Sequence, residues 1–248
     1  MTRGDVIFSV SRTLSLDSTP KDVDNPGEEL LLMQRWVNQG IRDVLNKTRC
    51  RLDESEMTLI GGESSYRIDD DILAVDEVSL GPGVGGPMLT EVDNQTLNDR
   101  LRSGATISGT VPDVYYIKGD YLRVAPVPPA GVVLHYFYVP RPAEIPADGT
   151  TANDSFDLAD GTYGGIPQEF HDAVELYCLW QGARYDDVSS GARGRTPGAT
   201  YHDDYVSRIK EVRKELRGKA GRGMHRARIG YPSLPVRRAA NDVYPAVG

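Results

Sequence analysis

The sequence predicts an α+β protein: an antiparallel bundle of four main helices, a β-rich insertion between the second and third helices, and an extended C-terminal arm. Apolar residues recur at helical spacing on both sides of a central region where they alternate with a period of two. The end of the chain has no stable apolar period. We therefore expect an N-terminal helix pair in residues 1–52, the insertion with one short helix in 53–150, a connecting loop and helix pair in 151–217, and a basic arm in 218–248.

The N-terminal helix pair has recognisable start signals. Residues 2–16 form the first expected helix, with Thr2 as its N-cap and Asp5 three residues later. Asn25 is the expected N-cap of the second helix, which should end near Cys50. Gly40 inside this helix costs about 1 kcal/mol relative to Ala, a cost that close approach of another helix would offset.

The insertion contains alternating apolar segments separated by turn residues. The predicted strands are Met57–Ile60, Tyr66–Ile68, Ile72–Leu80, Val114–Lys118, Tyr121–Val124 and Val132–Val139. Two-residue turns predict hairpins at Gly61-Gly62 and at Gly119-Asp120. A short helix is expected to start at the cap Thr90, and the three prolines of residues 125–131 exclude a central strand there.

The C-terminal helix pair follows a long connection. Residues 140–165 exceed the usual loop length, so we expect this connection to be functional or to cross a surface. The third main helix starts near Pro167 and is apolar on nearly all sides, which places it centrally in the bundle. The fourth should begin at the cap Thr200 and stop at Gly218.

Charge is distributed unevenly along the chain. The net charge is −8, yet residues 218–248 contain six Lys and Arg residues against the single acid Asp242. Two interpretations stay open: an arm that docks on an acidic surface, and a solvated basic end. Because ordering a segment without apolar periodicity is entropically costly, we expect the arm to become ordered only in an assembly.

Several classes of protein find little support. The chain has two cysteines, Cys50 and Cys178, and no disulfide or zinc spacing, which indicates folding in a reducing cytoplasm. No apolar run approaches the ~20 residues of a membrane span, and the N-terminus lacks a signal-peptide core. We therefore predict no membrane association.

The sequence contains only weak signals of a catalytic, cofactor-binding or metal site. The glycines within residues 80–87 have dinucleotide-binding spacing, but Pro82 and Pro87 remove amide donors and no helix follows at once. His171 and His202 each precede an Asp in a first helical turn, where a solvated or capping role is usual.

Acid runs such as Asp69–Asp71 are typical of solvated turns, and a Ser nucleophile motif is absent. We predict no catalytic residue, no cofactor and no metal site. A soluble enzyme of unknown reaction stays the least favoured alternative.

Three segments carry a resemblance to a known family. They are ELLLMQRWVNQGIRDVLNKTRC at 29–50, YLRVAPVPPAGVVLHYFYVPRPAEI at 121–145 and IPQEFHDAVELYCLWQGARYDD at 166–187. With the order of elements above, they resemble the head-to-tail adaptors, also called connector or head-completion proteins, of tailed bacteriophages.

The resemblance implies a structural protein of the virion neck, assembled in the host cytoplasm. Such adaptors form rings, commonly of twelve copies, that bind the portal protein and tail or nozzle proteins and let double-stranded DNA pass without being read. The candidate contacts to portal or neighbouring subunits are the Arg and Tyr residues of one loop and the arm: Arg193, Arg195, Arg222, Arg226, Arg228, Tyr231, Arg237, Arg238 and Tyr244. The alternative is another virion or tail-completion protein.

Overall fold

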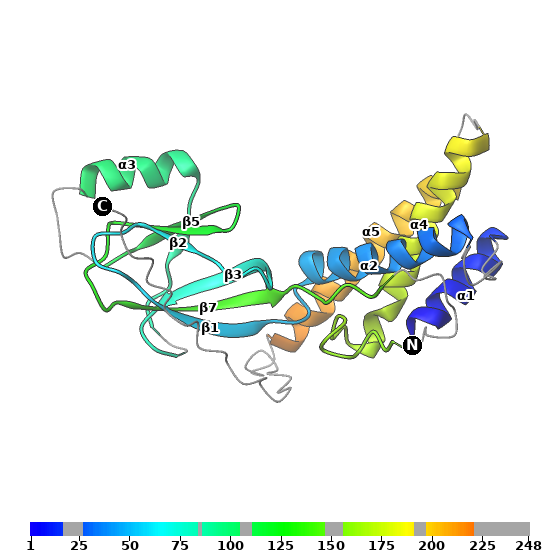
Figure 1. Ribbon diagram of the computed structural model, residues 1–248, viewed down its shortest axis with the longest axis horizontal. Helices are drawn as coiled ribbons and strands as arrows, with labels where there is room; N and C mark the ends of the chain where they lie inside the picture. The colour runs from blue at the N-terminus through cyan, green and yellow to red at the C-terminus, as the bar shows by residue number, and fades with distance from the viewer. Residues whose placement is uncertain (17–26, 84–85, 105–110, 147–155, 191–196, 221–248) are drawn as a thin grey trace, which may run out of the picture.

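The computed structural model describes residues 1–16, 27–83, 86–104, 111–146, 156–190 and 197–220. The molecule is elongated, with the N-terminal and C-terminal helices gathered at one end and the strands, together with one short helix, at the other (Figure 1). N-terminal helices, a β-rich region and two C-terminal helices follow one another along the chain, so the predicted α+β class is confirmed. Residues 221–248 of the predicted arm lie outside the described residues, and its first three residues belong to the last helix.

Helix α1 (Arg3–Leu14) begins with the predicted cap. The Thr2 amide donates to Asp5 Oδ2 at 2.7 Å, and the Asp5 amide donates to Thr2 Oγ1 at 3.2 Å. This reciprocal pair is a capping box, which satisfies two backbone donors at the helix start. These hydrogen bonds from Thr2 also lower the pKa of the Asp5 carboxyl.

Helix α2 (Glu28–Thr48) starts later than predicted. Its N-cap is Gly27, whose φ of 78° breaks the helix, so the predicted cap at Asn25 is wrong; Asn25 itself lies outside the described residues. Arg49 takes the left-handed conformation after the last turn and donates its amide to Leu45 O at 2.9 Å. The predicted end near Cys50 is confirmed.

Within the described residues, seven strands form two sheets. They are β1 (Asp53–Thr58), β2 (Ser65–Arg67), β3 (Ile72–Leu80), β4 (Thr90–Glu91), β5 (Val114–Lys118), β6 (Tyr121–Ala125) and β7 (Val133–Pro140). One sheet has the order β1-β7-β3 and is antiparallel; the other has the order β2-β6-β5-β4, with β4 parallel to β5. Their inner faces share an apolar core that includes Val78, Leu122 and Leu134. Helix α3 (Asn94–Gly104) covers the outer face of the four-stranded sheet, where Leu97 packs against Val114.

One predicted hairpin is confirmed and one is wrong. Strands β5 and β6 pair antiparallel across Gly119-Asp120. Gly61-Gly62 does not close a hairpin, because β1 pairs with β7 whereas β2 pairs with β6 in the other sheet. The chain crosses between the sheets at this point, and Gly61 lies so close to Ala130 that an added Cβ would be 2.7 Å from its amide nitrogen.

The short helix also starts elsewhere. Thr90 lies in strand β4 instead of capping α3, so that prediction is wrong. The cap is Asp93, whose Oδ1 accepts the Thr96 amide at 2.7 Å. Because Thr90 pairs with strand β5, it cannot cap the helix. The helix starts instead after Asp93, a second cap-forming residue three positions downstream.

Helix α4 (His171–Ser190) lies at the centre of the bundle, as predicted, and packs against α1, α2 and α5 (Pro197–Ala220). The predicted cap Thr200 and stop Gly218 are both wrong, because α5 begins at Pro197 and continues to Ala220. Proline suits a first helical turn. Gly218 does not take the positive φ that ends a helix.

The described part of the 140–165 connection enters the helical core instead of only crossing a surface. Ile145 and Leu158 are fully buried among the bundle residues. Asn38 of α2 holds the Ile145 backbone from both sides: its Nδ2 donates to the carbonyl oxygen at 2.7 Å and its Oδ1 accepts the amide at 3.3 Å. The connection is therefore an internal strap of the bundle.

Candidate assembly site

The predicted contact residues fall in two segments outside the described residues. Arg193 and Arg195 lie in residues 191–196, and Arg222, Arg226, Arg228, Tyr231, Arg237, Arg238 and Tyr244 lie in 221–248. What the structure does describe is the support of both segments: the α4–α5 pair precedes and follows the first, and α5 leads into the second. The candidate site is built on α5.

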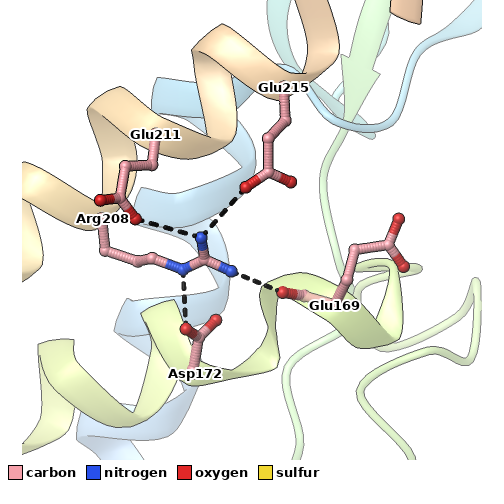
Figure 2. Close-up of polar contacts among 5 residues, drawn as sticks. All are labelled: Glu169, Asp172, Arg208, Glu211 and Glu215. Carbon is pink, nitrogen blue, oxygen red and sulfur yellow. Dashed lines mark hydrogen bonds and ion pairs between the residues drawn. The ribbon is translucent and has the colours of Figure 1, made fainter.

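Arg208 fastens α5 to the start of α4 (Figure 2). Its Nε donates to Asp172 Oδ2 at 2.7 Å, and its Nη2 donates to the Glu169 carbonyl oxygen at 2.8 Å. Its Nη1 donates at 3.3 Å to both Glu211 Oε2 and Glu215 Oε1 of its own helix. One guanidinium thus joins the first turn of α4 to two turns of α5.

The charge of Arg208 is well compensated. Its side chain is only 19% exposed, and this burial opposes the charged form. The hydrogen bond and charge of Asp172, helped by Glu211 and Glu215, nevertheless raise the pKa of the guanidinium above its ordinary value. Charge-assisted bonds of this kind fix orientation as well as contributing energy.

Tyr205, one turn before Arg208, fastens α5 to α2. Its hydroxyl donates to Asp43 of α2, and Lys47 lies both 2.7 Å from the Asp43 carboxylate and 5.0 Å from the centre of the Tyr205 ring. Burial, followed by the neighbouring Asp43 carboxylate, raises the pKa of the Tyr205 hydroxyl far above its ordinary value. Near the end of the helix, Arg213 Nε donates to the Lys47 carbonyl oxygen at 2.6 Å.

Aromatic rings fill the contact between α4 and α5. The Trp180 and Tyr205 rings are stacked with centroids 6.1 Å apart, and Tyr177 meets both edge-on. His202 lies with its ring 4.8 Å from Trp180 and is nearly half exposed. The predicted solvated role of His202 agrees with this exposure.

His171 differs from the prediction. It is 2% exposed, and its Nε2 lies 2.8 Å from the Ile166 carbonyl oxygen, so it is neither solvated nor a cap. Burial lowers the pKa of the imidazole and keeps it neutral at pH 7. The burial arises because the strap residues 156–166 fold back over the start of α4.

The glycine-rich loop after β3 does not form a phosphate cradle. Gly81 and Gly83 have positive φ values, but the following helix begins only at Asn94. The Gly83 amide already donates to Glu56 Oε1 at 2.7 Å, and a carboxylate in that place repels an anion.

Other titratable groups in the described residues show no catalytic arrangement. Burial raises the pKa of both thiols, Cys50 and Cys178, away from the reactive thiolate form. Asp70 is an exposed partner of Arg67 at 3.1 Å. Within the described ranges, no three His, Cys, Asp or Glu side chains are grouped as a metal ion requires.

The architecture and the comparison with known families agree. The family model described as SU10 adaptor protein matches residues 1–228, which include every element of the bundle and of the β-rich region. The chain belongs to the SU10 adaptor protein family. A search of curated proteins found no match.

Membership in the SU10 adaptor family gives the chain a structural role as a phage neck adaptor. The resemblance to head-to-tail adaptors is thereby confirmed. None of the described helices combines the length and apolar character needed to cross a membrane.

The contacts that position α5 were only partly visible in the sequence of this family member. Arg208, Glu211 and Glu215 have the i, i+3, i+7 spacing of one helix face, which could have indicated an ion-pair cluster. No local pattern places Asp172 or Asp43 beside α5, because both contacts join residues far apart in the chain.

Arg208→Met is expected to lower the free energy of unfolding by about 1–2 kcal/mol, since three carboxylates then face one another without a cation. The loss should shrink at about 1 M salt, where repulsion is screened. Urea unfolding measures it, with Lys210→Met, an exposed change on the same helix, as the control. Equal stability of the two variants would contradict the assigned role.

Proposed function

We propose that the chain forms a ring of twelve copies between the portal and the tail in the phage neck and lets double-stranded DNA pass. Its partners would be the portal protein, tail or nozzle proteins and neighbouring copies. The observation that supports this best is the family match over residues 1–228, which extends past α5 into the basic segment.

Electrostatics support passage of DNA rather than its recognition. Outside residues 218–248 the chain carries 22 Lys and Arg residues against 35 Asp and Glu residues. An acidic channel wall repels phosphates, so DNA slides instead of being held. DNA readers instead gather positive charge on the contacting face.

The two ends of the molecule suit two different partners. The helical bundle would face the portal and the neighbouring subunits, and the β-rich end would point toward the tail (Figure 1). The basic and aromatic residues of 191–196 and 221–248 would supply contacts to portal or subunits, with α5 as their rigid support.

Electron microscopy of the purified chain, with and without portal, tests the proposal. A ring with a central channel in either sample would support it and give the symmetry. Single copies in both samples would contradict the proposed ring and favour another virion or tail-completion role.

Salt should weaken attachment of the ring to the portal. If arginines meet acidic surfaces, raising salt from about 0.1 M to about 1 M shortens the Debye length from about 10 Å to 3 Å and should release the chain. Co-sedimentation with portal particles measures this, and attachment that is unchanged at about 1 M would exclude a mainly electrostatic contact.

A further inference from the structure

The strap residues 156–166 join the start of α1 to the start of α4. Three backbone hydrogen bonds hold this segment: Arg3 N to Phe156 O at 2.9 Å, Leu158 N to Met1 O at 3.3 Å and Ile166 N to Leu158 O at 3.0 Å. The beginning of the chain and the segment therefore lie side by side at the helical end of the molecule (Figure 1). We call residues 156–166 the strap segment.

His171, the first residue of α4, holds the end of the strap segment. Its Nε2 lies 2.8 Å from the Ile166 carbonyl oxygen. Because a carbonyl oxygen only accepts hydrogen bonds, Nε2 carries the proton of the neutral ring and Nδ1 carries none. Nδ1 is buried and has no hydrogen-bond partner within the described residues. The neutral imidazole is therefore the form that suits the closed strap segment.

Several features oppose a second proton on His171. The side chain is 2% exposed, and Nδ1 would become a buried donor without an acceptor, which is costly. The ring lies at the N-terminal end of α4, where the helix dipole disfavours a positive charge. The Met1 amine also opposes the charge. Arg51 brings a further cation to the strap segment, since its guanidinium donates to the Gly161 carbonyl oxygen.

Two carboxylates favour the second proton, and they are already engaged. Asp157 of the strap segment and Asp172 of α4 both attract a charge on His171. Asp157 lies 3.9 Å from the Met1 amine, and Asp172 accepts Arg208 Nε at 2.7 Å. Both carboxylates are about half exposed, so water screens them. Burial consequently remains the largest influence and lowers the pKa of the imidazole.

We propose that His171 is an acid-sensitive latch, whose protonation below about pH 6 releases the strap segment and the start of α1. The release is local, because Tyr205 and Arg208 fasten α5 to α2 and α4 through contacts that do not involve the strap segment. Helix α1 has only 12 residues, and an isolated helix of that length is marginal in water. Its start should therefore loosen together with the strap segment. This inference goes beyond the proposed ring and does not rest on it.

The sign of the pH dependence follows from the two states of the strap segment. Above about pH 6.5, the ordinary pKa of histidine, the imidazole is neutral whether the segment is open or closed, so the closed state is fully stable. Below that pH the open state takes up a proton more readily, and opening becomes more favourable. The loss stops growing once the pH is also below the lowered pKa of His171 in the closed state.

Hydrogen exchange of the full-length chain tests the latch at about pH 7 and about pH 5, with each rate divided by its intrinsic rate. The amides of Arg3, Leu158 and Ile166 should lose protection at least several-fold at the lower pH, whereas amides in the middle of α5 should keep theirs.

Two histidine variants separate the latch from a general effect of acid. His171→Gln keeps a donor for the Ile166 carbonyl oxygen and cannot take up a proton, so its strap segment should be equally protected at both pH values. His202→Gln, which changes an exposed histidine of α5, should retain the loss seen in the wild type. An equal loss of protection in the wild type and in His171→Gln would overturn the proposal.

A titration of the wild type keeps the test independent of how well His171→Gln folds. In nuclear magnetic resonance spectra, the His171 ring signals should titrate below about pH 6.5, and the Ile166 amide signal should change over the same pH range. A ring that titrates at or above about pH 6.5 would contradict the latch. So would an Ile166 amide that does not respond while the ring of His171 titrates.

Discussion

Removing residues 221–248 is expected to abolish attachment of the chain to the portal and to leave the folded part intact. The reason for the loss is charge: the segment supplies five arginines to a chain whose remainder is strongly acidic. The fold should survive because the described contacts that fasten α5 to the rest of the bundle, including those of Arg208 and Arg213, precede Ala220. Co-sedimentation with portal measures attachment, and circular dichroism measures the fold.

A charge-neutral variant separates the arginines from the rest of the segment. Changing Arg222, Arg226, Arg228, Arg237 and Arg238 to Gln in the full-length chain should reproduce the loss of attachment seen on truncation. If truncated protein still attaches to the portal, the segment is not the anchor. If truncation alone releases it, the anchor is apolar and Tyr231 and Tyr244 become the candidates.

Regular strands and helices were predictable where one face is uniformly buried. Strands Ile72–Leu80 and Val114–Lys118 have the predicted ends, because each is rich in apolar residues and is followed directly by turn residues, Gly81-Pro82 and Gly119-Asp120. Tyr205, Ile209 and Val212 likewise recur at helical spacing in the sequence and lie on one buried stripe of α5.

The errors occur where a distant part of the chain decides the local structure. Thr90 looks like a helix cap until β5 pairs with it, and Gly61-Gly62 looks like a hairpin turn until β7 inserts beside β1. His171 looks solvated until the strap residues fold over it. Each case is a tertiary contact that no local pattern contains.

The candidate site was predictable in charge but not in geometry. The concentration of arginines in 191–195 and 222–238 is a property of composition, and its contact role stays a prediction because these residues lie outside the described part. The contacts that position α5 needed the structure, since Asp43 and Asp172 come from two other helices.

Gly40→Leu is expected to be among the most destabilising single changes in the bundle. An added Cβ at Gly40 alone would lie 3.0 Å from Tyr177 Cδ1 and 3.3 Å from Val174 Cγ1, so a leucine must push α2 and α4 apart. Overpacking of this kind costs about 1–3 kcal/mol, and the better helix propensity of leucine returns less than about 1 kcal/mol of it. The predicted close approach at this glycine is thereby explained. Thermal unfolding should show a midpoint lower by several degrees.

Gly218→Leu is the matched control, because it makes the same chemical change in a helix where nothing lies within 4 Å of the added Cβ. Gly218→Leu should leave the free energy of unfolding unchanged or raise it by up to about 1 kcal/mol. We expect a small gain, because Gly218 lies near the end of α5. A loss of stability in Gly40→Leu together with a gain in Gly218→Leu would establish that α2 and α4 are in contact at Gly40. Equal effects would mean that helix propensity alone acts at both positions, and the close packing of Tyr177 against α2 would have to be abandoned.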